Sequence, residues 1–155
     1  MRVSIALVAL VLLVGEVRAE TWTVRPVPRT EGSGGSCVLE SEKASLSDGY
    51  QATTAQVVVD ARTVTVTSPS VLDGGFRDIG VAVDEEPLVP MDGLANPRTA
   101  RFESHYAALV EQFKRGSRAR LQLRFWPTWP VTGTHSVTIS LIGFTRAYAQ
   151  LLECR

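Results

Sequence analysis

Residues 51–67 read QATTAQVVVDARTVTVT, and this stretch decides the fold class. β-Branched residues, which favour strands, make up much of both halves. In residues 63–67 valine alternates strictly with threonine, as in an antiparallel strand that has one buried face and one exposed face. Because only Ala61 and Arg62 separate this segment from residues 51–60, we expect two antiparallel strands joined by a tight connection.

Other short strands are expected on both sides of this pair. Their segments are rich in apolar and β-branched residues and are bounded by turn residues such as Asp48-Gly49 and Ser68-Pro69. The segments are 37–41, 79–83, 88–91, 118–125 and 134–142. In the last two segments apolar and polar residues alternate, so one face of each strand is expected to point toward a core.

Residues 101–115 have the pattern of an amphipathic helix instead. Apolar residues recur there on one face of a 3.6-residue period, at Phe102, Tyr106, Leu109, Val110 and Phe113. Thr99 is a candidate N-cap, and Gly116 is a candidate residue just beyond the C-terminal end. A similar spacing predicts a short C-terminal helix at 144–154.

Several short strands and two helices, without β-α-β alternation, predict a mainly β fold. We expect an antiparallel, immunoglobulin-like β-sandwich that forms a single domain over residues 37–155. The preceding residues 20–36 contain Pro26, Pro28 and a Gly/Ser run. Proline and glycine contribute little to a core, so this segment is predicted to be an extended arm and a flexible loop.

Residues 1–19 are typical of a cleavable signal peptide. Arg2 supplies a positive charge, and residues 3–14 form an apolar run broken only by Ser4. A membrane anchor is the alternative, but spanning a bilayer takes about 20 apolar residues and this run is shorter. We expect cleavage after Ala19, a periplasmic or secreted protein, and no transmembrane span in the mature chain.

The two cysteines, Cys37 and Cys154, both lie in the expected mature chain. Export places them in an oxidising compartment, where an even pair favours a disulfide bond. Such a bond would tie the first predicted strand of the domain to the last helix. The alternative is two separate buried thiols. A zinc site is not expected, because neither CxxC nor paired-histidine spacing occurs.

The overall charge is balanced, with 16 basic and 16 acidic residues. Without Arg2, Arg18 and Glu16 of the signal peptide, 14 basic and 15 acidic residues remain. Bulk electrostatics therefore do not favour nucleic acid or another polyanion as a partner.

A local group of basic residues is nevertheless expected around the end of the first helix and the strand that follows. Its members are Lys114, Arg115, Arg118, Arg120 and Arg124, and the last three share the outward face of the strand. Arginine pairs bidentately with phosphates and carboxylates, so these residues form a candidate anion-binding surface. Candidate ligands are acidic envelope polymers or an acidic protein partner. The alternative is a charged strand face that protects a sheet edge.

Two tryptophans, Trp126 and Trp129, lie in a connection that two prolines stiffen. They form either an exposed aromatic platform for sugars or for a partner protein, or a buried cap on the open end of the sandwich. Aromatic burial favours the cap.

Candidates for catalysis or for metal binding are few. His105 and His135 are the only residues whose ordinary pKa suits a general base near neutral pH, and no GxSxG or other nucleophile motif accompanies them. A hydrolase that uses His135 is therefore the minority hypothesis, and we expect no enzymatic activity.

An acidic turn at residues 84–86, with Asp92 a few residues further on, supplies oxygen ligands without the spacing of a calcium loop. A solvated turn is favoured there. We expect no metal and no cofactor.

Three stretches can be compared with a known family: DIGVAVD at 78–84 followed by Pro87, YAALVEQFKRG at 106–116, and VTISLIGFTRAYAQL at 137–151. Together they resemble the invasion-associated locus B family of small bacterial periplasmic proteins. The resemblance covers about residues 37–152. Family members tend to carry a further cysteine pair near the middle of the chain, where residues 91–102 have none. The resemblance implies a β-sandwich, a periplasmic or outer-surface location, no enzymatic activity and, in some members, a link to host-cell interaction.

The leading hypothesis is an exported, non-enzymatic binding or interaction module whose partner is an envelope component or a protein. An envelope factor that binds anionic polymer through the basic strand is the first alternative, and the His135 hydrolase is the second.

Overall fold

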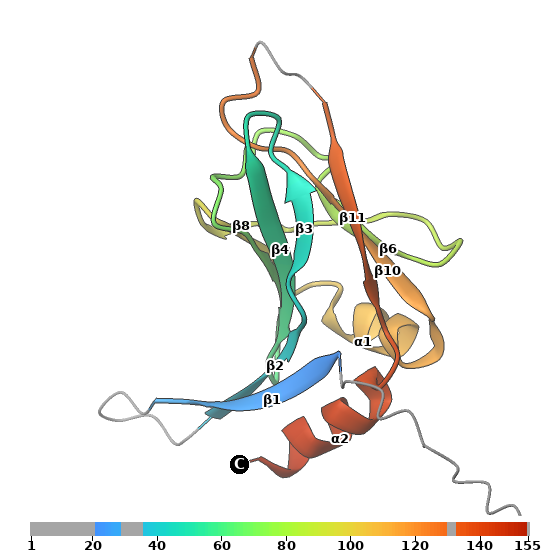
Figure 1. The fold of residues 1–155 in the computed structure, drawn as a ribbon. Helices are drawn as coiled ribbons and strands as arrows, with labels where there is room; N and C mark the ends of the chain where they lie inside the picture. Colours follow the sequence, from blue (N-terminus) through green and yellow to red (C-terminus); the bar gives the residue numbers. More distant parts are fainter. Residues whose placement is uncertain (1–20, 29–35, 130–132, 155) are drawn as a thin grey trace, which may run out of the picture.

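The computed structural model of this chain describes residues 21–28, 36–129 and 133–154. The predicted signal peptide at 1–19 and most of the Gly/Ser run lie outside these ranges. Two antiparallel sheets face each other, and two helices lie at one end of the sandwich (Figure 1). A mainly β, antiparallel sandwich with two helices is thereby confirmed.

The larger sheet has the strand order β1-β2-β4-β5-β9-β8, with β3 paired to β4 as well. Its strands are β1 (Trp22–Val27), β2 (Ser36–Ser41), β3 (Ala44–Ser47), β4 (Ala52–Val59), β5 (Val64–Thr67), β8 (Gly93–Asn96) and β9 (Thr99–Phe102). β4 and β5 are the two strands predicted from residues 51–67. β2 and β3 pair with successive parts of β4. Between these two parts of β4, the Oγ of Ser41 accepts a hydrogen bond from the backbone N–H of Val57 at 3.0 Å.

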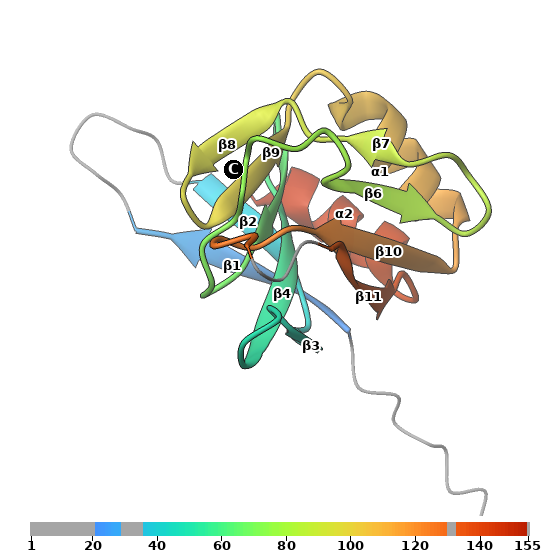
Figure 2. The ribbon, with the colours of Figure 1, turned by 90° about the horizontal axis from the view of Figure 1, so that it is seen from above.

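The smaller sheet has the order β11-β10-β6-β7. Its strands are β6 (Gly80–Val83), β7 (Val89–Pro90), β10 (Arg118–Leu123) and β11 (His135–Ser140). Seen from above, β6, β10 and β11 lie on one side of the molecule and β4, β8 and β9 on the other (Figure 2). β10 pairs with β11 on one side and with β6 on the other. Its arginines therefore do not protect a sheet edge, and that alternative is wrong.

The core lies between the sheets and follows the alternation read from the sequence. On β4 and β5 the inward valines are fully buried, and on β10 the buried residues are Ala119, Leu121 and Leu123. Burying a side chain of this size contributes about 1.5–3 kcal/mol. The strict alternation of residues 63–67 thus places one face in the core and leaves the threonines half-buried.

Helices α1 (Tyr106–Arg115) and α2 (Phe144–Glu153) close one end of the sandwich. Three rings hold this end together: the ring centroids of Trp22 and Phe144 are 4.9 Å apart, and those of Phe113 and Phe144 are 5.3 Å apart. The indole N–H of Trp22 donates to the carbonyl oxygen of Ser140 at 2.9 Å. α2 also packs against β1 and β2.

The prediction of an extended arm is wrong for residues 22–27. β1 pairs with β2 along its whole length, and Trp22 is only 2% exposed. Pro26 is compatible with this strand because β1 is an edge strand, where a residue without an N–H breaks no ladder on the open side.

The prediction that the first helix starts at residue 101 is also wrong. Residues 99–102 form β9, in which Phe102 pairs with Val64 of β5. Thr99 therefore begins a strand and is not an N-cap; His105 occupies that position without a side-chain cap bond. Phe102 fits a strand pattern as well as a helical one, because the buried residues Ala100 and Phe102 alternate with the less buried Thr99 and Arg101. Residues 99–102 form a strand because their backbone N–H and C=O groups pair with those of β5, and this tertiary pairing overrides the helical pattern.

Gly116 does follow the helix, but for a different reason from the one expected. Its φ is −83°, so it does not adopt the left-handed conformation of a helix-ending glycine. A Cβ at this position would lie 2.3 Å from Cγ1 of Val83. Glycine is required here because the helix end touches β6.

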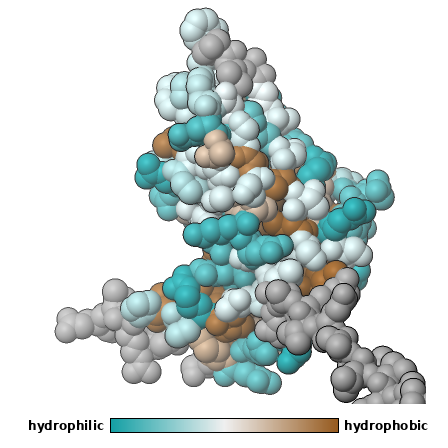
Figure 3. Space-filling view, in the orientation of Figure 1, coloured by the Kyte–Doolittle hydropathy of each residue, from teal (hydrophilic) through white to brown (hydrophobic). Residues whose placement is uncertain are grey.

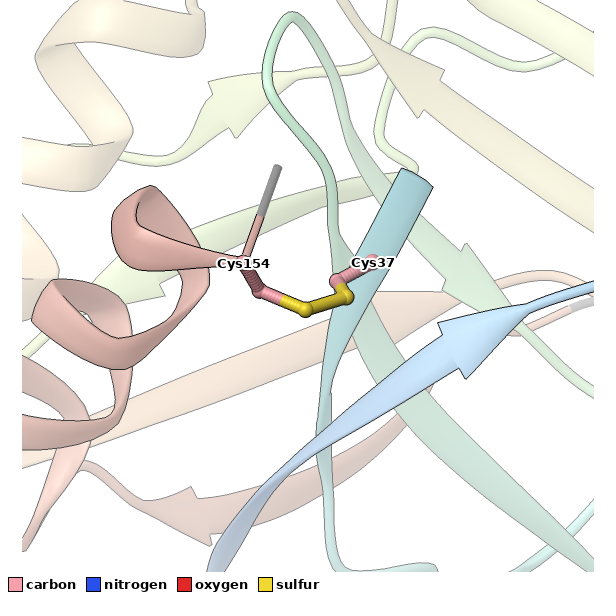
Figure 4. Close-up of a disulfide and its surroundings, with 2 residues drawn as sticks. All are labelled: Cys37 and Cys154. Atoms are coloured by element: carbon pink, nitrogen blue, oxygen red, sulfur yellow. A yellow bond between two sulfur atoms is a disulfide. The ribbon is translucent and has the colours of Figure 1, made fainter. Parts of the chain in front are cut away.

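The predicted disulfide bond is confirmed. Cys37 on β2 and Cys154 at the end of α2 are bonded, with their Cα atoms 6.0 Å apart (Figure 4). Within the described ranges no helix is long and apolar enough to cross a membrane.

Candidate functional site

The candidate site lies where β10 leaves its sheet, at the end of the sandwich away from the helices. After Leu123 the chain crosses toward the larger sheet, where Phe125 forms an isolated bridge with Leu72. The backbone N–H of Trp126 then donates to the carbonyl oxygen of Val71 at 2.8 Å. Buried Phe125 anchors the crossing, and the residues that follow it face solvent.

Three large aromatic side chains are exposed at this end, and we call them the aromatic cluster: Tyr50, Trp126 and Trp129. Their exposed fractions are 53%, 64% and 79%. Both tryptophans are therefore exposed, and the alternative that they form a buried cap is wrong. The sandwich is closed here by Phe125 and Leu72 instead.

Tyr50 holds the tryptophan loop in place. Its hydroxyl lies 3.1 Å from the carbonyl oxygen of Pro127 and 3.2 Å from that of Trp129, and donates to both. Tyr50 follows the predicted Asp48-Gly49 turn, in which Gly49 has a φ of +96°. The turn before β4 and the loop after β10 are thus joined, although 77 residues separate Tyr50 from Pro127.

An open groove of about 520 Å³ lies beside Trp126. Its other walls come from the beginning of β4 and from the connections after β5 and β8. Polar side chains line most of it: Asp48, Gln51, Thr54, Ser70 and Arg98. Among the described residues, Trp126 is the one aromatic side chain in its lining.

A buried hydrogen-bond network forms the floor of this groove. One carboxylate oxygen of Asp48 accepts the backbone N–H groups of Tyr50 and Gln51, each at 2.9 Å. The other oxygen accepts the hydroxyl of Ser70 at 2.7 Å. A second contact of 2.9 Å joins the Ser70 hydroxyl to that of Thr53. Every group on the floor therefore has a partner, which fixes its position.

These bonds keep Asp48 charged. Burial opposes the charge, but the hydrogen bonds from Ser70 and from the backbone of Gln51 and Tyr50 outweigh it, so the pKa of Asp48 lies below its ordinary value. Arg98 supplies the opposite charge at the rim. Its Nε donates to the carbonyl oxygen of Pro69 at 2.7 Å. Within the described residues the terminal NH₂ groups of Arg98 have no hydrogen-bond partner.

The five basic residues predicted as an anion-binding surface differ in their interaction partners. Arg124 is occupied: its guanidinium forms a bidentate pair with Asp78 at 2.7–2.9 Å, and it lies 4.2 Å from the ring centroid of Phe76. Lys114 pairs with Glu111 at 2.7 Å. Both contacts remove charge from the surface that the sequence predicted.

Arg115, Arg118 and Arg120 remain, and we call them the basic patch. Arg120 donates to the side-chain oxygen of Gln122 at 2.7 Å. Among the described residues none of the three forms an ion pair with a carboxylate. None of the three lines the groove beside Trp126. The basic patch and the aromatic cluster are therefore separate surfaces.

Neither histidine belongs to the lining of the groove beside Trp126. His105 precedes α1, and the ring of His135 packs against that of Phe125 with a centroid distance of 5.7 Å. In the described part of the chain neither ring is hydrogen-bonded to a serine, threonine or cysteine side chain.

Two of the acidic residues considered as metal ligands, Asp84 and Asp92, accept hydrogen bonds from neighbouring backbone. Asp84 accepts the backbone N–H groups of Ser117 and Arg118 at 2.9 and 3.0 Å. Asp92 accepts those of Glu103 and Ser104 just before α1. Across residues 21–28, 36–129 and 133–154, no three His, Cys, Asp or Glu side chains lie close enough to hold a metal ion.

Sequence reasoning found the two tryptophans but missed Tyr50, Asp48 and Arg98 as their neighbours. An aromatic residue directly after an Asp-Gly turn was the one local signal for Tyr50. No local signal connects residue 98 to residue 126, because the sandwich topology brings them together.

The end of the sandwich away from the helices is mostly pale in the hydropathy view, and stronger hydrophobic patches lie nearer its middle (Figure 3). The described residues that are visible at this end are thus mostly of intermediate hydropathy in that view.

No protein-family model matches the chain, and comparisons with curated proteins and with solved structures give no match either. Function is therefore inferred from the residues themselves.

Proposed function

We propose that this chain is exported and works in the cell envelope or outside the cell as a non-enzymatic binding module, as its resemblance to the invasion-associated locus B family implies. The signal-like residues 1–19 support export. The Cys37–Cys154 disulfide supports it as well, since such bonds form and persist in oxidising compartments. A link to host-cell interaction belongs to the same proposal.

The aromatic cluster carries the binding part of this proposal. Tyr50, Trp126 and Trp129 are three of six large hydrophobic side chains that are exposed in the described residues, and they share one end of the molecule. Aromatic side chains of this size are normally buried, and grouped exposure marks surfaces that bind something. Tyrosine and tryptophan are also enriched among the residues that dominate binding energies.

Two measurements test the proposal. Fractionation of the native cell should find the chain outside the cytoplasm without residues 1–19, and a cytoplasmic pool of the uncleaved chain would contradict export. In the second measurement, immobilised mature protein is incubated with the native envelope fraction. Capture of an envelope component should be lost in Trp126→Ala/Trp129→Ala and retained in the control Leu152→Ala, which changes an exposed residue on α2. Equal capture by both variants would exclude the aromatic cluster.

A second candidate function rests on the basic patch. Arg115, Arg118 and Arg120 are exposed and lack carboxylate partners among the described residues, so they are available to an acidic envelope polymer. Binding of purified acidic polymer should weaken at least about tenfold in Arg118→Glu/Arg120→Glu and should fall with added salt. Arg124→Gln is the matched control, because Asp78 already occupies that guanidinium. Unchanged binding in the double variant would remove this candidate.

A further inference from the structure

The groove beside Trp126 combines two kinds of surface, one aromatic and one polar. One wall is the exposed indole of Trp126. The remaining walls offer an amide from Gln51, a hydroxyl from Thr54 and a guanidinium from Arg98. An apolar anchor from a protein partner would leave these polar groups without water or hydrogen bonds, at a cost of about 1–3 kcal/mol each.

Sugar rings fit this combination. Each ring has a face of C–H groups that stacks on the electron-rich face of an aromatic ring, and an edge of hydroxyls that both donate and accept hydrogen bonds. The indole of Trp126 matches the face. The amide, hydroxyl and guanidinium groups of the groove match the edge.

The charges of the groove favour an uncharged glycan. Asp48 contributes one negative charge to the floor, and Arg98 contributes one positive charge at the rim. Among the described residues no further cation lines the groove, and no member of the basic patch belongs to its lining. A sulfated or uronic-acid chain would therefore meet Asp48 without a surplus of cations to offset the repulsion.

The site is also held in shape before any ligand arrives. The Tyr50 hydroxyl fixes the loop carbonyls of Pro127 and Trp129, and the Asp48–Ser70–Thr53 network fixes the floor. Preorganisation of this kind lowers the entropy cost of binding. Trp129 lies three residues beyond Trp126 and offers a second ring for a neighbouring sugar unit.

We infer that the groove and the aromatic cluster bind an uncharged carbohydrate chain of at least two sugar units, stacked on Trp126 and Trp129 and hydrogen-bonded to Gln51, Thr54 and Arg98. This inference rests on the proposed function, because it names the ligand class of the same site.

The experiment uses the exported mature protein and a printed array of defined glycans that includes neutral, uronic-acid and sulfated chains. We expect binding to neutral chains. The strongest neutral binder is then titrated as a soluble oligosaccharide while tryptophan fluorescence is followed, and we expect a Kd below about 1 mM. Trp126→Ala should weaken binding at least about tenfold, and Arg98→Ala several-fold. The control Leu152→Ala should bind like the unchanged protein. Thermal melts confirm that each variant is folded.

Three results would overturn the inference. Absence of any neutral binder on the array is the first. Binding confined to sulfated or uronic-acid chains and abolished by Arg118→Glu/Arg120→Glu is the second, and it would favour the basic patch. The third is envelope capture that requires Trp126 but disappears after the envelope fraction is treated with protease. In that case the partner is a protein, so the proposed function stands while the carbohydrate inference fails. Capture that does not depend on Trp126 would defeat both.

Discussion

At the scale of single residues, Asp48 does the most to shape the candidate site. Its carboxylate joins the turn that carries Tyr50 to Ser70 on the connection after β5, and so sets the distance between two walls of the groove. The side chain is only 8% exposed, although aspartate is rarely buried without partners. The hydrogen bonds from two backbone N–H groups and one hydroxyl make its burial tolerable.

We predict that the contribution of Asp48 to stability depends on pH. Its folded pKa is lowered, so the contribution is fully present above the ordinary aspartate pKa of about 4 and is lost as the pH falls through the folded value. Asp48→Asn keeps the side-chain shape but replaces the oxygen that accepts from Ser70. At pH 7 it should lower the free energy of unfolding by about 1 kcal/mol.

Urea unfolding at pH 7 and pH 3 measures this effect. The loss caused by Asp48→Asn should be smaller at pH 3 than at pH 7, because at pH 3 the unfolded chain already binds the proton that the folded Asp48 disfavours. Glu85→Gln, in an exposed turn, is the control and should have little effect at either pH. A loss of the same size at both pH values would mean that the charge of Asp48 plays no part.

At the scale of elements, β1 and the two helices form one unit. Trp22 inserts between Phe113 of α1 and Phe144 of α2, so the first strand of the mature chain completes the helical end. An edge strand leaves the backbone groups on its outer side unpaired. The side chain of Trp22 holds the edge strand β1 in place, by its packing and by its hydrogen bond to Ser140 of β11.

We predict that Trp22→Ala lowers the free energy of unfolding by about 3–5 kcal/mol, because it removes a fully packed ring and leaves a cavity. Thr23→Ala, on the exposed side of the same strand, should change it by less than about 0.5 kcal/mol. Chemical denaturation measures both. Similar values for the two variants would show that β1 is a dispensable arm.

At the scale of the whole molecule, the disulfide joins two parts of the chain that are 117 residues apart. It fastens α2 to β2 at the helical end, whereas the turn before β4 and the loop after β10 lie at the other end (Figure 1). The disulfide and the proposed binding surface are thus at opposite ends of the sandwich. Loss of the bond is therefore expected to affect folding more than the shape of the groove.

We predict that reduction raises the mass of the intact mature protein by about 2 Da and lowers the free energy of unfolding by about 2–4 kcal/mol. Cross-linking so long a loop restricts the unfolded chain, which is the main source of the effect. Mass spectrometry and denaturation with and without reductant measure the two quantities. An unchanged mass, or free thiols that react with an alkylating reagent before reduction, would contradict the bond.

Much of the sandwich could be predicted because its signals are local. The alternation of residues 63–67, the alternating strands near 118–125 and 134–142 and the spacing of the last helix each follow from neighbours a few positions apart. The Cys37–Cys154 bond was predicted from the expected export and from the even number of cysteines. β3, β8 and β9 were not predicted as strands, because each is short and because the apolar spacing around β9 also fits a helix.

The sequence by itself determined the strand and helix periods and the one possible cysteine pair, because each depends on local spacing or on composition. Only the tertiary structure decided that β1 belongs to the core, that Asp78 occupies Arg124 and that Tyr50, Arg98 and Trp126 meet at one end. These facts depend on which distant backbone groups pair and which surfaces remain uncovered. The packing of the whole chain determines these pairings and these uncovered surfaces, and no local sequence pattern predicts either.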